Sequence, residues 1–269
     1  MRTGAGGASR RTLGVKLPIA IVAQRSRVSH IFEMTDLVEC SSTLVHQRLE
    51  ALYRCDPRGR MVTVNEWDGR AAPRFHLMRT AQESIARYRT DLADDLVARL
   101  EQLRVQEQVG RQSGKLPALC SKYLELLSSH APIIRVWAGP VFVFPANVVT
   151  LVHTVSITGT NEHLLRGGFD DWLQDLRHRQ PFIAVVENNR AISICASVRI
   201  SGSIHCAGVE TLVEHRKRGH AANVVARWAL AVRALGATPF YSTSWENQPS
   251  QRVAARLHLN NVGIDFHVS

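Results

Sequence analysis

Hydrophobic and polar positions divide the chain into a polar start and two patterned regions. Apolar residues recur at strand-like or helix-like spacing only after about residue 33. In the first region, residues 34–145, the pattern predicts a hairpin, a strand, two helices and a last strand, over 52–64, 75–78, 91–110, 117–127 and 133–143. Asp91 is the expected N-cap of the first helix, and Pro117 opens the second. This region therefore predicts a small α+β domain.

The second region, residues 146–269, has a more regular order of elements. The pattern predicts a strand, two short helices, three strands, a long helix, a strand, a helix and a closing strand. In this order the expected elements cover 148–157, 161–165, 169–176, 182–186, 191–198, 205–213, 219–235, 240–244, 249–259 and 264–268. In the long helix, apolar residues from Val224 to Val232 share one face, so this helix is expected to pack on a sheet.

A basic turn, Arg216-Lys217-Arg218-Gly219-His220-Ala221, stands between the fourth strand of this region and the long helix. Unpaired backbone N–H groups and the positive end of the helix dipole point at one place there, which favours an anion. Gly219 lets an anion approach the backbone, while Arg216 and Arg218 add positive charge. A charged turn at a helix start is also common as plain solvated surface, and both readings stay open at this point.

The spacing Arg216-x-x-Gly219-x-Ala221 resembles the acetyl-CoA signature of the GCN5-related N-acetyltransferase (GNAT) superfamily. Downstream, 238–250 resembles the next strand and the asparagine-bearing helix start of that family. The resemblance covers 146–269 and is densest over 207–259. It implies an α/β (α+β) fold with a mixed, mostly antiparallel sheet, whose fourth and fifth strands splay apart, flanked by helices. The region 34–145 remains a smaller α+β domain without an assigned role.

By that resemblance, acetyl-CoA is the expected co-substrate, and no metal is expected. Its pantetheine arm would pair with the main chain of the fourth strand, and its diphosphate would bind backbone N–H groups at the helix start, with Asn247 and Ser250 steadying the last helix. The residues implied are Thr211, Leu212 and Val213 for the arm, and Arg216, Arg218, Gly219, His220 and Ala221 for the diphosphate. Asn247 is also a plausible helix N-cap on its own account.

Acetyl transfer to an amine requires a base, because an ammonium group with a pKa near 10 must lose a proton. Glu210 lies within the apolar stretch 207–213, where an acid is costly unless it is paired or functional. It is the first candidate for the base or for an anchor of the substrate ammonium, and His205 is the second. Many relatives carry a tyrosine that protonates the leaving thiolate, but the matching residue here is Ala254. Tyr241 is the candidate general acid, unless it belongs to the core.

The net charge of +10 comes largely from the polar start, where six basic residues precede the first acid, Glu33. Binding to nucleic acid would therefore rest on residues 1–33, which are expected to be a disordered tail rather than a secretory signal or transit peptide, with Met34 a possible true start. No apolar run reaches the length of a membrane span. Five cysteines without paired spacing indicate a reducing cytoplasm.

These observations leave several functions open. The leading hypothesis is an acetyl-CoA-dependent N-acetyltransferase that works by direct attack of an acceptor amine. The alternative is a non-catalytic acetyl-CoA-binding module, which the missing tyrosine favours. An acyltransferase with a cysteine nucleophile is a further possibility, but no cysteine has a local signature of activation. The sequence identifies neither the acceptor nor the oligomeric state.

Overall fold

The computed structural model describes residues 34–150 and 152–269, so the basic tail expected at 1–33 lies outside the described residues. The described helices are α1 Ser42–Leu52, α2 Asp94–Val105, α3 Cys120–His130, α4 His220–Ala234 and α5 Gln248–Arg256. Short 3-10 turns are η1 Glu162–Leu165, η2 Asp170–Trp172, η3 Leu176–His178 and η4 Val213–His215.

A nine-stranded sheet has the order β5-β4-β13-β7-β12-β11-β10-β9-β8. Its strands are β4 Phe75–Arg79, β5 Ser84–Tyr88, β7 Val136–Val143, β8 Val155–Ser156, β9 Phe182–Glu187, β10 Arg190–Ile200, β11 Ile204–Thr211, β12 Thr238–Ser242 and β13 Asn260–Val268. Two small ladders pair β1 Met34–Asp36 with β6 Gln112–Gly114, and β2 Tyr53–Cys55 with β3 Met61–Val64. Neighbours in the large sheet run antiparallel, except β11 and β12, which are parallel. The expected mixed, mostly antiparallel sheet with flanking helices is confirmed.

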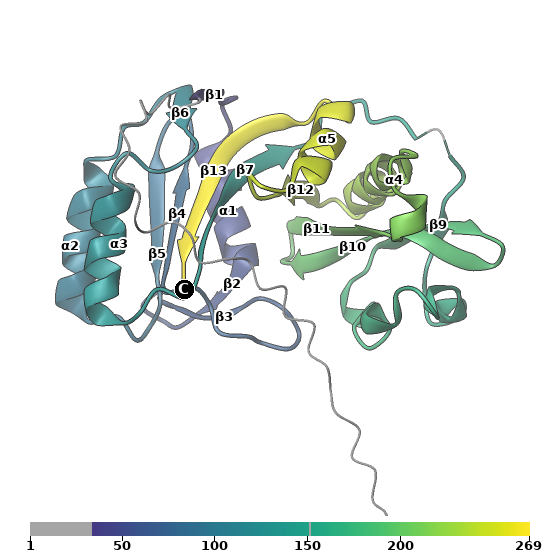
Figure 1. Ribbon diagram of the computed structural model, residues 1–269, viewed down its shortest axis with the longest axis horizontal. Coiled ribbons are helices and arrows are strands. Elements are labelled where there is room, and N and C mark those ends of the chain that lie inside the picture. Colours follow the sequence, from purple (N-terminus) through teal and green to yellow (C-terminus); the bar gives the residue numbers. More distant parts are fainter. Residues whose placement is uncertain (1–33, 151) are drawn as a thin grey trace, which may run out of the picture. The chain divides into compact units, whose positions relative to one another are not determined.

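Helices cover both faces of the sheet (Figure 1). On one face, α4 and α5 pack over β9–β12, and α2 and α3 pack over β4, β5 and β13. The other face carries α1 with the β2–β3 ladder and, at the far end, η1–η3. Side chains alternate across a strand, so Tyr241 of β12 faces α4 while its neighbour Phe240 faces α1. We call these two sides the α4 face and the α1 face.

The expected boundary at residues 145/146 falls between β7 and β8, but the sheet is continuous across it. β7, from the first region, lies between β12 and β13 and pairs with both. β4 pairs with the other edge of β13. Contacts within Phe32–Ser269 group these residues into one unit. The first region therefore contributes strands to the same sheet that carries the basic turn.

Two expectations about single elements are wrong. The strand expected over 148–157 is reduced to β8, because β9 pairs with only Val155 and Ser156; Val149 is instead 70% exposed. Asp91 does not cap α2, which begins at Asp94 after Ala93. Arg89 donates two hydrogen bonds of 2.7 Å to the Asp91 carboxylate, and this ion pair occupies both oxygens that the cap would use. No helix of the described chain is long and apolar enough to cross a lipid bilayer.

Candidate functional site

The parallel strands β11 and β12 separate soon after they meet. They pair only over Ile204–Cys206 and Thr238–Phe240, and β11 then continues alone to Thr211. We call the Cys206–Phe240 pair, where the two strands part, the fork. The splayed fourth and fifth strands expected for the second region are thus present as β11 and β12.

Beyond the fork, no strand among the described residues pairs with one edge of β11. On its other edge, the amide of Leu212 donates to the carbonyl of Ile192 on β10. Backbone groups alternate between the two edges of a strand, so the backbone of Glu210 also faces β10, whereas Val209 and Thr211 face the gap toward β12. The Nε atom of Arg216 donates to the Thr211 carbonyl at 3.0 Å, which agrees with this orientation. The Thr211 carbonyl apart, the gap is therefore lined by backbone groups that no strand of the described chain pairs with, as an added extended chain would require.

The basic turn brings the chain from this edge into α4. Lys217 and Gly219 both adopt positive φ, at 64° and 87°. The second value is in a region that glycine enters at little cost. α4 then begins at His220, and the first amides of a helix have no partner within it. The side-chain amide of Asn223 donates a hydrogen bond to the Gly219 carbonyl at 3.1 Å. The turn thus presents N–H groups at a helix start, as the sequence predicts for an anion site.

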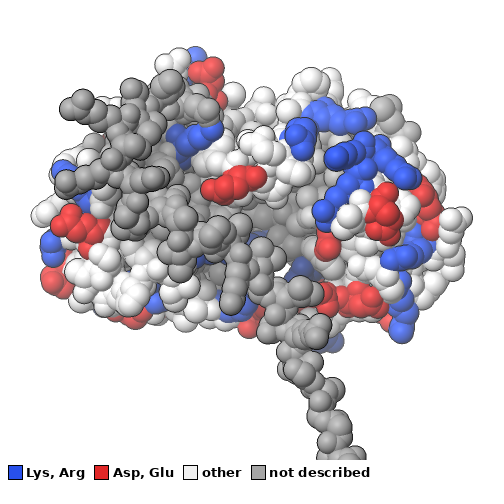
Figure 2. Space-filling view, in the orientation of Figure 1, with Lys and Arg blue, Asp and Glu red and all other residues white. Residues whose placement is uncertain are grey.

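Arg256, at the end of α5, places a positive charge beside the basic turn, and the sequence did not predict this position. A Cβ atom on Gly219 would lie 2.9 Å from its Nη1 atom, so the guanidinium covers this part of the turn. Together with Arg252, it extends the exposed cations Arg216, Lys217 and Arg218. Figure 2 shows Lys and Arg side chains gathered in a band over α4 and α5. In the sequence, only the spacing of Arg252 and Arg256, four residues apart on one helix, pointed to this charge. That spacing does not identify the segment beside which the arginines lie.

His220 lies in a second small cluster at the start of α4. Its Nε2 atom is 3.8 Å from Glu187, and Nδ1 of His215 is 3.6 Å from the same carboxylate. These three side chains are close enough to hold a single cation. They also join the β9–β10 hairpin, through Glu187, to the basic turn.

Glu210 lies on the α1 face of β11, beyond the fork, and its side chain is exposed. The indole Nε1 of Trp172 donates to its Oε2 atom at 2.8 Å. The guanidinium of Arg179 lies over the Trp172 ring, 4.6 Å from the ring centroid. The sequence placed Glu210 in an apolar stretch without naming a partner; the structure supplies one from η2.

His205 lies on the α4 face and is buried. Ser197 Oγ is 2.8 Å from its Nδ1 atom and accepts a hydrogen bond from the Trp228 indole at 3.0 Å. Burial lowers the pKa of His205 below its usual value. A neutral histidine engaged beneath α4 is a structural group, so the second candidate for the base does not reach the gap.

Tyr241 is buried beside α5. Its hydroxyl lies 2.5 Å from Ser250 Oγ, in the first turn of that helix. Asn247 is the N-cap of α5, because its Oδ1 atom accepts from the Ser250 amide at 3.1 Å. Ala254, one turn later, is buried in the same cluster. Burial raises the pKa of Tyr241 to about 12, so its hydroxyl remains protonated at neutral pH.

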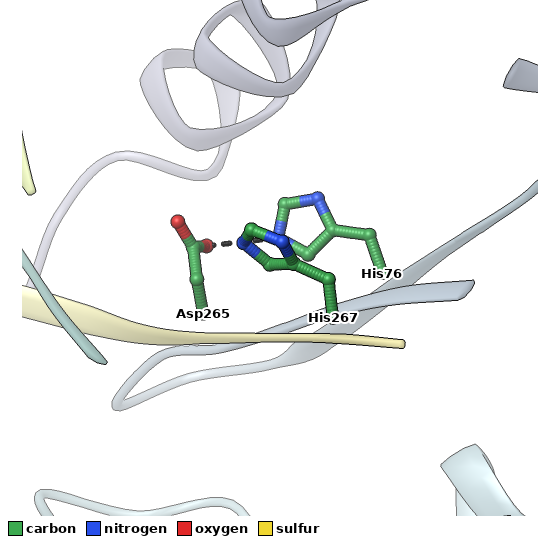
Figure 3. Close-up of side chains that lie close together, drawn as sticks. All are labelled: His76, Asp265 and His267. Atoms are coloured by element: carbon green, nitrogen blue, oxygen red, sulfur yellow. Dashed lines mark hydrogen bonds and ion pairs between the residues drawn. The ribbon is translucent and has the colours of Figure 1, made fainter. Parts of the chain in front are cut away.

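A buried polar cluster lies on the α1 face, and the sequence analysis did not predict it. Arg48 of α1 donates two hydrogen bonds, of 2.6 and 3.2 Å, to Asp265 of β13, and His76 of β4 contacts the same carboxylate at 3.0 Å. His267 lies beside His76, with ring centroids 5.0 Å apart (Figure 3). Burial alone would raise the pKa of Asp265, but Arg48 and His76 hold it well below its usual range. Asp265 is thus ionised and already neutralised by a guanidinium.

Comparison with known proteins gives no match to a family model and no match to a curated protein. The chain is similar to solved structures of GNAT-family proteins. It is 16% identical to one from Novosphingobium aromaticivorans, with TM-score 0.40, over 51% of this chain and 66% of that one. A GCN5-related N-acetyltransferase-like protein from Streptococcus suis is 12% identical, with TM-score 0.43, over 74% and 85%. A GCN5-related N-acetyltransferase from Sphaerobacter thermophilus is 15% identical, with TM-score 0.42, over 75% and 78%.

These solved proteins carry the name of the superfamily whose signature the motif Arg216-x-x-Gly219-x-Ala221 resembles. At this level of identity the likeness concerns the fold alone. The functional argument rests on the fork, the basic turn and the side chains around them.

Proposed function

We propose that the protein is an acetyltransferase that moves the acetyl group of acetyl-CoA to an acceptor amine by direct attack. The observation that carries the proposal is the fork. It leaves a free backbone edge on β11, from Ala207 to Thr211, that leads through the basic turn into α4. An extended amide-bearing arm and a diphosphate are the two ligand parts that such an edge and such a helix start bind best.

In this proposal the cofactor-binding residues lie in the second region, 146–269. The pantetheine arm pairs with the gap-facing backbone of β11 near Thr211, and the diphosphate binds the N–H groups of Arg218 to Ala221. Arg256 adds charge next to Gly219. Leu212 and Val213 have a smaller part than the resemblance implies, because the Leu212 amide is bonded to β10 and Val213 lies in η4 with 71% of its surface exposed.

Glu210 is the proposed base. It lies beyond the fork on the face opposite α4, and the Trp172 indole fixes one carboxylate oxygen. The other oxygen can accept a proton from the acceptor ammonium. The neutral amine then attacks the thioester carbonyl, the carbon–sulfur bond breaks to release the CoA thiolate, and the nitrogen gives its surplus proton to water to leave the neutral amide.

Tyr241 and Ser250 are the proposed hydrogen-bond donors to the departing sulfur. A tyrosine with a pKa of about 12 is a weaker acid than an ordinary thiol, so transfer of its proton to the thiolate is uphill. Tyr241 therefore stabilises the developing negative charge by hydrogen bonding, and the thiolate takes its final proton from water.

The cysteine-nucleophile alternative is disfavoured by the state of the thiols. Burial raises the pKa of Cys206, which belongs to the fork, and of Cys195 on β10. Their reactive thiolate forms are therefore scarce. The non-catalytic alternative keeps one observation in its favour, which is Ala254 at the position where many relatives carry a tyrosine.

The test uses the full-length protein in two measurements. Calorimetric titration with acetyl-CoA measures binding, and reaction of DTNB with released CoA measures turnover with a panel of amines. The proposal expects binding together with thiol release that depends on an added amine. Binding without release for any amine would support the non-catalytic module, and absence of binding would overturn both.

A further inference from the structure

A pocket of about 370 Å³ lies on the α1 face of the sheet. Its wall combines α1 with strands from both regions of the chain. Apolar contributions come from Leu52, Val64, Pro73 and Trp137. Most of the charged side chains in the pocket wall are arginines.

The register of the sheet places this pocket at the fork. Arg199 of β10 is paired with Cys206 of β11, and Cys206 is paired with Phe240 of β12. Paired residues point to the same face, and Ser242, two residues beyond Phe240, points there too. Arg199 and Ser242 both line the pocket. It therefore lies on the face opposite α4, the face that also carries Glu210.

The polar lining is dominated by cations. Arg48, Arg70, Arg135 and Arg199 contribute to it, against one acidic side chain, Asp265. Asp265 is held by Arg48 at 2.6 Å and by His76 at 3.0 Å, so it is not available to a substrate ammonium. Figure 3 shows the contact with His76. Glu66, outside the lining, pairs with Arg70 and Arg199 at 2.7 and 2.6 Å. The pocket is thus suited to a ligand that brings its own oxygen acceptors.

Two of these arginines also have buried donors that the described chain leaves without an acceptor. They are the Nε atoms of Arg48 and Arg199. The Arg48 side chain is only 1% exposed. A guanidinium stays protonated and offers only donors. A carboxylate is the acceptor that suits such a lining, because it presents several lone pairs to the edge of a planar guanidinium.

We propose that this pocket binds the acceptor and that the acceptor carries a carboxylate as well as the reacting amine. The inference rests on the proposed acetyl transfer. The carboxylate lies among the arginines of the α1 face, and the amine reaches the gap beyond the fork, where Glu210 takes its proton. The acceptor class is therefore a small amino acid or a similar amino-carboxylate, and its uncharged part lies against Trp137 and the neighbouring apolar side chains.

The experiment compares amines that differ only in the carboxylate. CoA release is measured for 4-aminobutyrate against butylamine, and for an α-amino acid against its amide, with phosphoethanolamine as the phosphate-bearing case. The carboxylates are expected to have kcat/KM at least tenfold higher than their partners. Equal or higher kcat/KM for the amines that lack the carboxylate, or for phosphoethanolamine, would overturn the inference.

A variant tests the pocket itself. Arg199→Lys keeps a positive charge for Glu66 but removes the Nε–H donor, and it is expected to raise KM for the carboxylate amine at least fivefold. The control is Arg227→Lys, an exposed position on α4, which is expected to leave KM unchanged. Acetyl-CoA affinity is expected to be the same in both variants. An unchanged KM in Arg199→Lys would count against the pocket.

Failure of this inference and failure of the proposed function are distinguishable. Loss of the function shows as no acetyl-CoA binding by calorimetry. If acetyl-CoA binds but no amine of the panel reacts, saturation-transfer NMR on the complex with CoA measures acceptor binding directly. Preferential binding of 4-aminobutyrate over butylamine, weakened by Arg199→Lys, would support the pocket, and equal binding would overturn it.

Discussion

Gly219 at the start of α4 and Arg256 at the end of α5 lie against one another, since a Cβ atom on Gly219 would be 2.9 Å from Arg256 Nη1. Gly219 also has φ of 87°, which L side chains rarely adopt. The contact brings a guanidinium from the last helix to the helix start that we assign to the diphosphate. Two separate requirements, the left-handed backbone conformation and room for the neighbouring guanidinium, therefore meet at one residue.

Gly219→Ala is expected to weaken acetyl-CoA binding at least tenfold, because the added methyl group occupies the space between the amides and Arg256. Calorimetric titration measures the loss. The matched control is Gly236→Ala, at the other end of α4, where φ is 76° and no atom lies within 4 Å of the added Cβ. Both variants bear similar backbone strain, of about 1 kcal/mol. Equal acetyl-CoA affinity in the two would contradict the anion site.

Glu210→Gln is expected to lower kcat by about a hundredfold or more, since the amide cannot accept the ammonium proton. Acetyl-CoA affinity should stay close to that of the unmodified protein, because Glu210 lies on the face opposite α4. Glu214→Gln, an exposed acid in η4, serves as the control and should retain full turnover. A fully active Glu210→Gln variant would remove this residue from the mechanism.

Trp172→Phe tests the positioning of that carboxylate separately. Phenylalanine keeps a ring beneath Arg179 but cannot donate the 2.8 Å hydrogen bond to Glu210. The carboxylate then loses the donor that holds one of its oxygens in place, so kcat is expected to fall several-fold while acetyl-CoA affinity stays unchanged. An unchanged kcat would show that the indole has only a packing role.

The sequence predicts the local parts of this site well, and the reason is that they depend on neighbours in the chain. The basic turn needs only a strand, a glycine and a helix start in succession, and Asn247 caps α5 with a residue three positions later. The hairpin β2–β3 and the helix α4 likewise follow from short-range patterns.

The other parts depend on pairing between distant segments. β7 lies between β12 and β13, although more than ninety residues separate Val143 from Thr238. The pairing of β4 with β13, with α1 packed on the same face, brings Arg48, His76 and Asp265 together. In the sequence, Asp265 is an acid between the apolar residues Ile264 and Phe266, which signals a buried partner without identifying it. The pocket on the α1 face was for that reason beyond sequence reasoning.

Tyr241→Phe is expected to lower kcat about tenfold, because the departing thiolate loses a hydrogen-bond donor. It should also lower the free energy of unfolding by about 1 kcal/mol, since the contact with Ser250 is lost. Steady-state kinetics and denaturant unfolding measure the two effects. Ser250→Ala is the companion variant. If both variants lose stability but keep kcat, Tyr241 is a core residue with no part in the reaction.

His267 should make the stability of the fold depend on pH below about 6.5. Burial, together with the nearby His76, lowers the pKa of His267 to about 3. Its ring stacks on Trp137, with centroids 4.5 Å apart. In the unfolded chain the same group titrates near 6.5. Between these two values the unfolded state binds the extra proton, so the free energy of unfolding falls as pH falls, by at most about 1.4 kcal/mol per pH unit from this group. Above pH 6.5 the His267 side chain is neutral in both states and adds nothing to the pH dependence.

Urea unfolding at pH 7, 6, 5 and 4 measures how the free energy of unfolding depends on pH, and His267→Gln should reduce the slope of this dependence relative to the unmodified protein. The exposed His258→Gln is the control. Equal slopes in His267→Gln and the unmodified protein would mean that His267 becomes protonated in the folded state as readily as in the unfolded one.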